Sequence, residues 1–192
     1  MPGSSLWLLP PKSHPLNSLL SSLIERTAKH FNSPHLFIPH VTLTSEISPS
    51  IYSADPQSWL DQIKFPAGSE VKVKLGKLNS EDVFVRKLYS TIEKSGVREI
   101  GKVARTVVKG YEDDIKAQQW VEEKYGPHLS LLYHDCPKVS EEDIAEIERI
   151  VQEAGVSLKG EGELGGWTNG RVVLVPTDQP IKGWVPAAER HL

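Results

Sequence analysis

Two stretches of the sequence decide the fold, PHVTL at residues 39–43 and PHLSL at residues 127–131. Both read proline, histidine, apolar residue, hydroxyl residue, apolar residue. Side chains alternate between the two faces of a β-strand, so His40 shares a face with Thr42, and His128 shares one with Ser130. The other face of each strand is apolar and suited to core packing. We therefore expect two strands that present four polar side chains to one cleft.

The duplication carries more weight than either copy. The chain has seven histidines, so a single His-x-Thr on a strand has little meaning. A second copy with the same preceding proline, similar apolar neighbours and a strand context is much harder to attribute to chance. We therefore favour a functional pair over a structural coincidence.

Paired imidazoles suit acid–base chemistry. Histidine is the side chain whose two protonation states coexist near neutral pH, so one ring can act as general base while the other acts as general acid. Neighbouring hydroxyls can donate to phosphoryl oxygens. The arrangement suits in-line opening of a cyclic phosphodiester and requires neither a metal nor another cofactor. The residues do not distinguish the base from the acid.

The remaining periodicity predicts an α+β chain whose second half repeats the first in outline. Apolar spacing and capping residues indicate helices, and alternating or β-branched runs indicate strands. We expect Asp55 and Ser140 to cap helices, and a last strand around Trp184. Expected helices cover residues 15–31, 55–65, 100–108, 113–125 and 140–154; expected strands cover residues 6–9, 36–45, 70–75, 83–92, 127–133 and 172–175.

The length, net charge and cysteine content of the chain indicate its domain organisation, its type of ligand and its cellular compartment. We expect the 192 residues to form a single bilobal domain over residues 1–192, because no low-complexity linker divides them. A formal net charge of −3 argues against a stable complex with long nucleic acid and favours a small phosphorylated ligand. The single cysteine and the lack of a recognisable signal or membrane segment predict a soluble, intracellular, cytoplasmic protein, which we expect to be a monomer.

At these residues the sequence resembles the two-histidine (2H) phosphoesterases, and within them the fungal 2′,3′-cyclic-nucleotide 3′-phosphodiesterases. The strand at residues 6–9 and both histidine segments carry this resemblance, which spans essentially the whole chain. It implies a bilobal, pseudo-symmetric α+β fold with two mainly antiparallel sheets that line a central cleft and helices outside. Some fungal members are associated with the Golgi, for which this sequence holds no visible signal.

The resemblance also implies an activity. It predicts hydrolysis of nucleoside 2′,3′-cyclic phosphates to 2′-phosphates, and of ADP-ribose 1″,2″-cyclic phosphate, a tRNA-splicing by-product, to the 1″-phosphate. His40 and His128 become the catalytic pair, while Thr42, Ser130 and Tyr133 become substrate-binding residues. Alternation would point Tyr133 away from Ser130, so its role requires the strand to end or twist before residue 133.

Two alternatives remain at the level of sequence. One is a 2H phosphodiesterase that processes RNA ends, which a comparison of mononucleotide and oligonucleotide substrates would distinguish. The other is a non-catalytic module that binds phosphorylated ends and would keep its activity without the histidines. Outside the motifs, Trp167 is either a stacking platform or a core residue, and we favour a solvated strand face over a phosphate site for Lys72 and Lys74.

Overall fold

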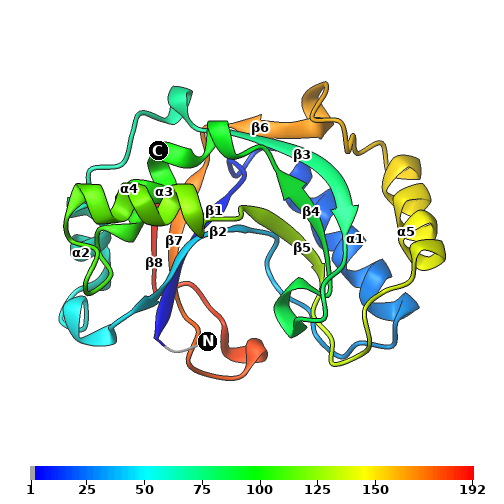
Figure 1. The fold of residues 1–192 in the computed structure, drawn as a ribbon, viewed down its shortest axis with the longest axis horizontal. Coiled ribbons are helices and arrows are strands. Elements are labelled where there is room, and N and C mark those ends of the chain that lie inside the picture. Colours follow the sequence, from blue (N-terminus) through cyan, green and yellow to red (C-terminus); the bar gives the residue numbers. More distant parts are fainter. Residues whose placement is uncertain (1–2) are drawn as a thin grey trace.

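A computed structural model describes residues 3–192, which form one curled antiparallel sheet with helices on its outer side (Figure 1). The strands are β1 (Ser4–Leu9), β2 (Val41–Ile47), β3 (Lys72–Asn79), β4 (Leu88–Ile92), β5 (His128–Leu132), β6 (Gly166–Thr168), β7 (Arg171–Pro176) and β8 (Ala188–His191). The helices are α1 (Leu16–His30), α2 (Pro56–Gln62), α3 (Arg98–Arg105), α4 (Asp114–Glu123) and α5 (Glu141–Glu153).

The strand order shows how the two lobes meet. It runs β6-β3-β4-β5-β2-β1-β7-β8, and every neighbouring pair is antiparallel. Four strands on each side form a lobe, and the lobes join where β2 pairs with β5 through Val41 and Leu129. The strands that carry the two histidine motifs, β2 and β5, therefore lie at the centre of the sheet. This confirms the predicted bilobal α+β architecture, with the two expected sheets joined into one.

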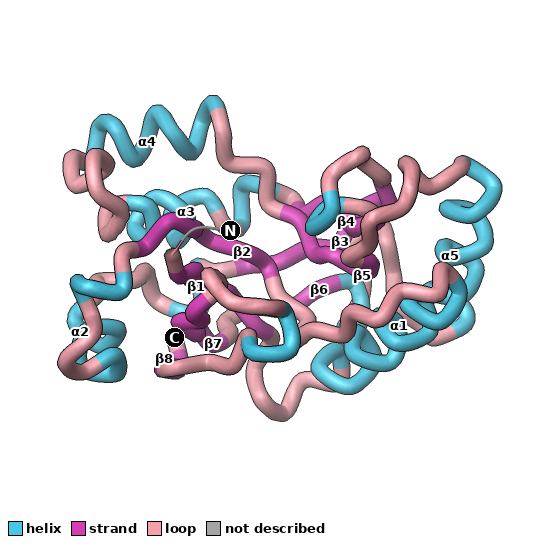
Figure 2. The backbone as a smooth tube through the Cα atoms, turned by 90° about the horizontal axis from the view of Figure 1, so that it is seen from below, coloured by secondary structure: helices cyan, strands magenta, loops and turns pink. Residues whose placement is uncertain are grey.

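Helices cover the outer side of both lobes. Helix α1 contacts β5 and α5, whereas α3 contacts β2 and α4 (Figure 2). Helix α2 contacts β8 at the far edge of the sheet. Among residues 3–192, no helix is both long and apolar enough to cross a bilayer.

Strand β1 separates two apolar clusters. Leu6 and Leu8 belong to the large cluster beneath the helices, and Trp7 and Leu9 belong to a smaller cluster on the opposite face. This alternation buries every residue of β1, because both faces of the strand are covered. The smaller cluster, which we call the inner aromatic cluster, has six buried members: Trp7, Leu9, Tyr133, Val173, Val175 and Trp184.

Most expected elements are present, and the helix caps are confirmed. The Asp55 carboxylate accepts from the backbone N–H of Ser58, and the Ser140 hydroxyl accepts from that of Asp143. Such caps satisfy N–H groups that have no partner within the first turn of a helix.

Three expected strands differ most clearly from the structure. The strand expected over residues 36–45 begins only at Val41, because the side chains of Phe37 and Ile38 pack against the inner aromatic cluster. The strand expected over residues 83–92 is divided into a 3₁₀ turn at Phe84–Arg86 and β4. The last strand lies at Ala188–His191 rather than around Trp184, which is buried in the inner aromatic cluster.

The junction of the lobes provides a test of core packing. Leu129 is fully buried where β5 meets β2, so Leu129→Ala should lower the free energy of unfolding by about 2–5 kcal/mol. Urea denaturation measures this loss. The matched control is Leu36→Ala, because Leu36 is 56% exposed and its truncation should change the value by less than about 0.5 kcal/mol. Equal losses in the two variants would contradict this account of the junction.

Candidate active site

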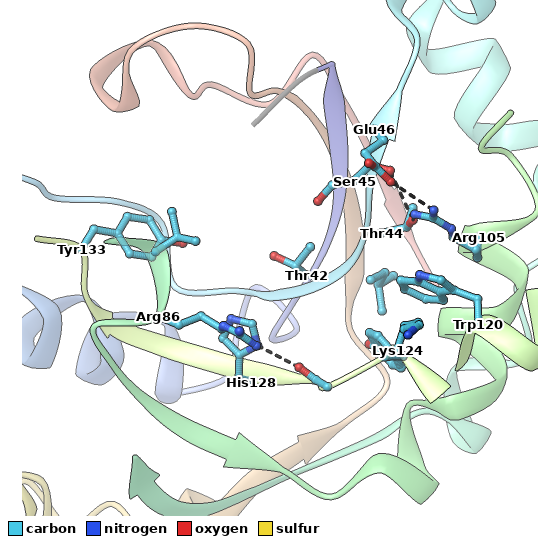
Figure 3. Close-up of a pocket in the computed structure, with 14 residues that line it drawn as sticks. Thr42, Thr44, Ser45, Glu46, Arg86, Arg105, Trp120, Lys124, His128 and Tyr133 are labelled. Carbon is cyan, nitrogen blue, oxygen red and sulfur yellow. Dashed lines mark hydrogen bonds and ion pairs between the residues drawn. The ribbon is translucent and has the colours of Figure 1, made fainter. Parts of the chain in front are cut away.

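A cavity with a volume of about 300 Å³ lies along β2 and the start of β5. It runs from Tyr133, past Thr42 and His128, to the side of α3 and α4, where Arg105 and Trp120 line it (Figure 3). This volume is at the lower end of the range of small-molecule sites. Of the five predicted site residues, Thr42, His128 and Tyr133 line the cavity, whereas His40 and Ser130 are buried beside it.

The register of β2 against β5 places the four motif side chains together. Val41 pairs with Leu129 in an antiparallel arrangement, so one step outward on either side sets His40 opposite Ser130 and Thr42 opposite His128. Each cross-strand pair therefore combines an imidazole from one motif with a hydroxyl from the other. Directly opposed residues of an antiparallel pair are near neighbours on the same face. The predicted convergence of the two motifs thus follows from one backbone pairing.

Both imidazoles are anchored in the same way. His40 Nδ1 donates to the Ile38 carbonyl at 2.6 Å, and His128 Nδ1 donates to the Gly126 carbonyl at 2.9 Å. A ring whose Nδ1–H is engaged by a carbonyl has its lone pair on Nε2 when neutral. Each ring can therefore accept a proton at Nε2 or, once protonated, donate one from there.

His40 is enclosed by aromatic rings. Its ring stacks on Trp7 with centroids 3.7 Å apart, and its Nε2 accepts from the Tyr133 hydroxyl at 3.4 Å. Only 4% of the residue is exposed. Burial lowers the pKa of His40 to about 3, although the hydrogen bond to Ile38 opposes this effect. His40 is consequently neutral at physiological pH in the free protein.

His128 is less enclosed and lines the cavity directly. Burial lowers its pKa, and the Gly126 carbonyl opposes that shift. The positive charge of Arg86 lowers the pKa further, and the negative charge of Glu81 raises it. These two residues form an ion pair at 2.5 Å, so the charges that act on His128 largely compensate one another.

The two motif hydroxyls differ in availability. The Thr42 hydroxyl lies in the cavity, and none of residues 3–192 forms a hydrogen bond with it. The Ser130 hydroxyl instead donates to the Val85 carbonyl at 2.8 Å. To donate to a ligand in the cavity, the Ser130 hydroxyl must first release this carbonyl.

Tyr133 connects the buried and the open parts of the site. Strand β5 ends at Leu132, so Tyr133 lies outside the strand. The alternation of side chains along the strand, which would have pointed Tyr133 away from Ser130, therefore does not apply to it. Its ring stacks on Phe37 with centroids 3.7 Å apart, and its hydroxyl reaches His40 while the residue lines the cavity. Burial raises the pKa of Tyr133, which keeps the hydroxyl protonated and able to donate.

Sequence reasoning missed the charged and aromatic residues on the other walls. Arg86 comes from a segment expected to be a strand, whereas Trp120 belongs to α4 and Lys124 follows it, and neither lies in a recognisable motif. From the sequence, Arg105 and Lys109 are two possible cleft residues that cannot be ranked, and the structure places Arg105 but not Lys109 in the lining of the cavity. No sequence signal separates these side chains from ordinary surface residues, because only the tertiary fold packs α3 against β2 and α4 against α3.

Other candidates lie outside this cavity. Lys74 pairs with Glu93 at 3.1 Å, which agrees with the preferred interpretation of a solvated strand face. Trp167 is 4% exposed within the large apolar cluster, so it is a core residue rather than a stacking platform. Among residues 3–192, there is no group of three or more histidine, cysteine, aspartate or glutamate side chains that could hold a metal ion.

Burial of a neutral His40 predicts a specific pH dependence of stability. The unfolded chain takes up this proton near pH 6.5, whereas the folded chain takes it up only near pH 3. The unfolding free energy should therefore be highest above pH 6.5 and should fall by up to about 1.4 kcal/mol per pH unit as the pH drops toward 3.

The variant His40→Gln lacks this contribution to the pH dependence, so its unfolding free energy, measured by urea denaturation, should fall less steeply as the pH drops. His191→Gln, a change at a side chain that is 60% exposed, should keep the wild-type slope. Identical slopes in wild type and His40→Gln would contradict the burial argument.

Comparisons with known proteins agree with this geometry. The family described as "Cyclic phosphodiesterase-like protein" matches residues 1–192. The chain is 54% identical to a 2′,3′-cyclic-nucleotide 3′-phosphodiesterase of Phaeosphaeria nodorum and 42% identical to one of Neurospora crassa, with 100% of both chains covered in each comparison. A Yarrowia lipolytica protein of the same name is 26% identical over 95% of this chain and 96% of its own. The resemblance that the paired histidine segments predicted is confirmed, and the chain belongs to the cyclic phosphodiesterase-like protein family.

Proposed function

We propose that this protein hydrolyses nucleoside 2′,3′-cyclic phosphates to nucleoside 2′-phosphates by acid–base catalysis with His40 and His128. The coarser part of this assignment, a cyclic-nucleotide phosphodiesterase, follows from the family and from two full-length relatives at 54% and 42% identity. The roles of the residues and the bond that is cleaved are inferred from the site.

The observation that carries the mechanism is the shared anchoring of the two rings. Each imidazole fixes its Nδ1–H on a backbone carbonyl two residues earlier, which leaves Nε2 as the reactive nitrogen. The register supports a common site, because each ring lies opposite the hydroxyl of the other motif. Two proton carriers, His128 in the cavity and His40 buried beside it, suit a hydrolysis that needs a general base and a general acid.

In the proposed reaction, one imidazole takes a proton from water as the water oxygen attacks phosphorus. The bond between phosphorus and O3′ breaks, and the other imidazole, in its protonated form, donates a proton to the departing O3′. One water molecule is consumed, and the phosphate stays on O2′. Both rings have a lowered pKa in the free protein, and the negative charge of a bound cyclic phosphate would oppose that shift and favour the imidazolium needed as acid.

Hydroxyl groups complete the proposed binding of the phosphoryl oxygens. Thr42 lies in the cavity with its hydroxyl uncommitted among residues 3–192, so it is the best-placed donor. Tyr133 can donate from the opposite wall, where its hydroxyl already bonds to His40. Ser130 contributes after release from Val85, or holds Tyr133 in place. Preorganised donors of this kind stabilise charge that develops in the transition state.

The resemblance to the fungal enzymes extends the proposal to a second substrate. We include ADP-ribose 1″,2″-cyclic phosphate, which would be opened to the 1″-phosphate and would connect the protein to the by-products of tRNA splicing. Both substrates present a five-membered cyclic phosphate on a ribose, so the same proton carriers serve both. The net charge of −3 supports a small substrate over long RNA.

Loss of the more accessible imidazole tests the proposal directly. His128→Ala should lower kcat for adenosine 2′,3′-cyclic phosphate by about 10²- to 10⁴-fold, because it removes one proton carrier. Steady-state turnover measures the loss of kcat, and chromatography of the wild-type product should show the 2′-phosphate.

The matched control is His191→Ala, which should retain wild-type kcat because this exposed histidine lies outside the cavity. Urea denaturation checks that both variants fold. Near-normal turnover by His128→Ala, or a 3′-phosphate product, would refute the mechanism.

The same mechanism predicts that turnover is independent of divalent cations. Both proton transfers are assigned to imidazoles, so kcat should stay the same in an excess of chelator. The measurement is the initial rate before and after dialysis against chelator. A loss of activity that added Mg²⁺, Mn²⁺ or Zn²⁺ restores would show that a metal takes part in catalysis.

A further inference from the structure

The end of the cavity farthest from Tyr133 is cationic and is not used by the proposed mechanism. Arg105 and Lys124 line it on either side of Trp120, while Thr42 and His128 lie toward the middle of the cavity (Figure 3). These two cations come from α3 and from the residue that follows α4, so neither belongs to the histidine motifs.

Arg105 is held rigidly in this wall. Its side chain is 5% exposed, and its guanidinium carbon lies 3.9 Å from the centre of the Tyr111 ring and 4.5 Å from that of Trp120. Nη1 also donates to the Thr44 hydroxyl at 3.3 Å. A planar guanidinium fixed between aromatic faces presents its N–H groups in a set direction and suits recognition of carboxylate or phosphate oxygens.

The charge of Arg105 is only loosely compensated. Nη2 forms an ion pair with Glu46 at 3.0 Å, yet the Glu46 side chain is 56% exposed. Glu46 also has a φ of 68°, a left-handed conformation that is unfavourable for a residue with a Cβ and is often found at functional positions. Within residues 3–192, the buried Nε–H of Arg105 has no hydrogen-bond partner. Buried donors normally have an acceptor, so an oxygen bound beside Arg105 would satisfy a group that these residues leave unpaired.

Lys124 adds a second positive charge at the same end. It is exposed, and none of the ion pairs within residues 3–192 includes it. Arg86, the cation nearer His128, is by contrast paired with Glu81. Arg105 and Lys124 together face one carboxylate, that of Glu46, so the excess positive charge of the cavity lies at this end rather than beside the histidines.

We propose that Arg105 and Lys124 form a second anion subsite, which binds a phosphate on C5 of the same ribose that carries the cyclic phosphodiester. This inference rests on the proposed function, because the cyclic phosphate must lie at the histidines. The incoming phosphate replaces the Glu46 carboxylate on Arg105 and takes a further donor from Lys124. Such a subsite favours substrates with a phosphate or pyrophosphate at this carbon, of which ADP-ribose 1″,2″-cyclic phosphate is one, over plain nucleoside cyclic phosphates.

A pair of matched substrates tests the subsite. Adenosine 2′,3′-cyclic phosphate is compared with the same nucleotide that also carries a 5′-phosphate. Charge-assisted hydrogen bonds from two cations should raise wild-type kcat/KM by about tenfold or more for the 5′-phosphorylated substrate, mainly through a lower KM. The measured quantity is the ratio of the two kcat/KM values.

Three variants locate the effect. Lys124→Gln removes one cation and should lower the ratio by about threefold or more, whereas Glu46→Gln removes the competing carboxylate and should raise it. Lys109→Gln is the matched control: Lys109 is also exposed and follows α3, but it lies outside the cavity, so the ratio should stay at the wild-type value. Urea denaturation confirms that each variant is folded.

The outcomes separate this inference from the proposed function. Absence of turnover with either substrate would contradict the proposed function. Calorimetric titration of adenosine 2′-phosphate with and without a 5′-phosphate into His128→Ala then still tests the subsite, and at least tenfold tighter binding of the 5′-phosphorylated nucleotide would support it. A wild-type ratio near one, or a ratio that Lys124→Gln leaves unchanged, would overturn the second subsite while leaving the cyclic phosphodiesterase intact.

Discussion

The antiparallel pairing of Val41 with Leu129 is the constraint on which the site depends. This pairing joins two four-stranded lobes, and it sets the imidazole of each motif opposite the hydroxyl of the other. A shift of the register by one residue would turn one motif toward the helices and leave the other alone on the concave face. The apolar residues of the motifs prevent such a shift, because Val41 and Leu129 are fully buried in the large cluster. Core packing therefore specifies the register, and the register specifies the site.

The inner aromatic cluster, on the concave face of the sheet, makes the surroundings of the two histidines different. Trp7 stacks on His40 and the Tyr133 hydroxyl contacts its ring, so the two histidines have unequal environments although both are held by a backbone carbonyl. An enclosed, neutral imidazole is costly to protonate in the free protein, whereas the more accessible His128 exchanges protons with solvent more readily. The similar backbone settings of the two motifs thus hold two imidazoles with unequal surroundings, which suits a reaction that needs both a base and an acid.

The sequence predicts features that depend on neighbouring residues better than features that depend on contacts between distant segments. Caps, amphipathic helices and the two histidine motifs depend on residues close in sequence, and they were recognised. The start of β2 was misplaced because Phe37 and Ile38 are drawn into a cluster built mainly from distant segments. The cationic wall was not assigned for the same reason, since Arg105 and Lys124 become cavity residues only when α3 packs against β2 and α4 packs against α3. The two motifs are visible in the sequence, whereas the walls of the cavity depend on tertiary packing.

The distribution of charge explains how an acidic protein accommodates an anionic ligand. Although the chain has a net charge of −3, the cavity is lined by Arg86, Arg105 and Lys124 and by a single acidic side chain, Glu46. Coulomb interactions weaken with distance and with screening by salt, so these nearby partly buried charges outweigh dispersed surface carboxylates. A local positive field at the ligand is compatible with repulsion of long polyanions from the rest of the surface. Selectivity for small phosphorylated molecules can therefore arise from where the charges lie rather than from their sum.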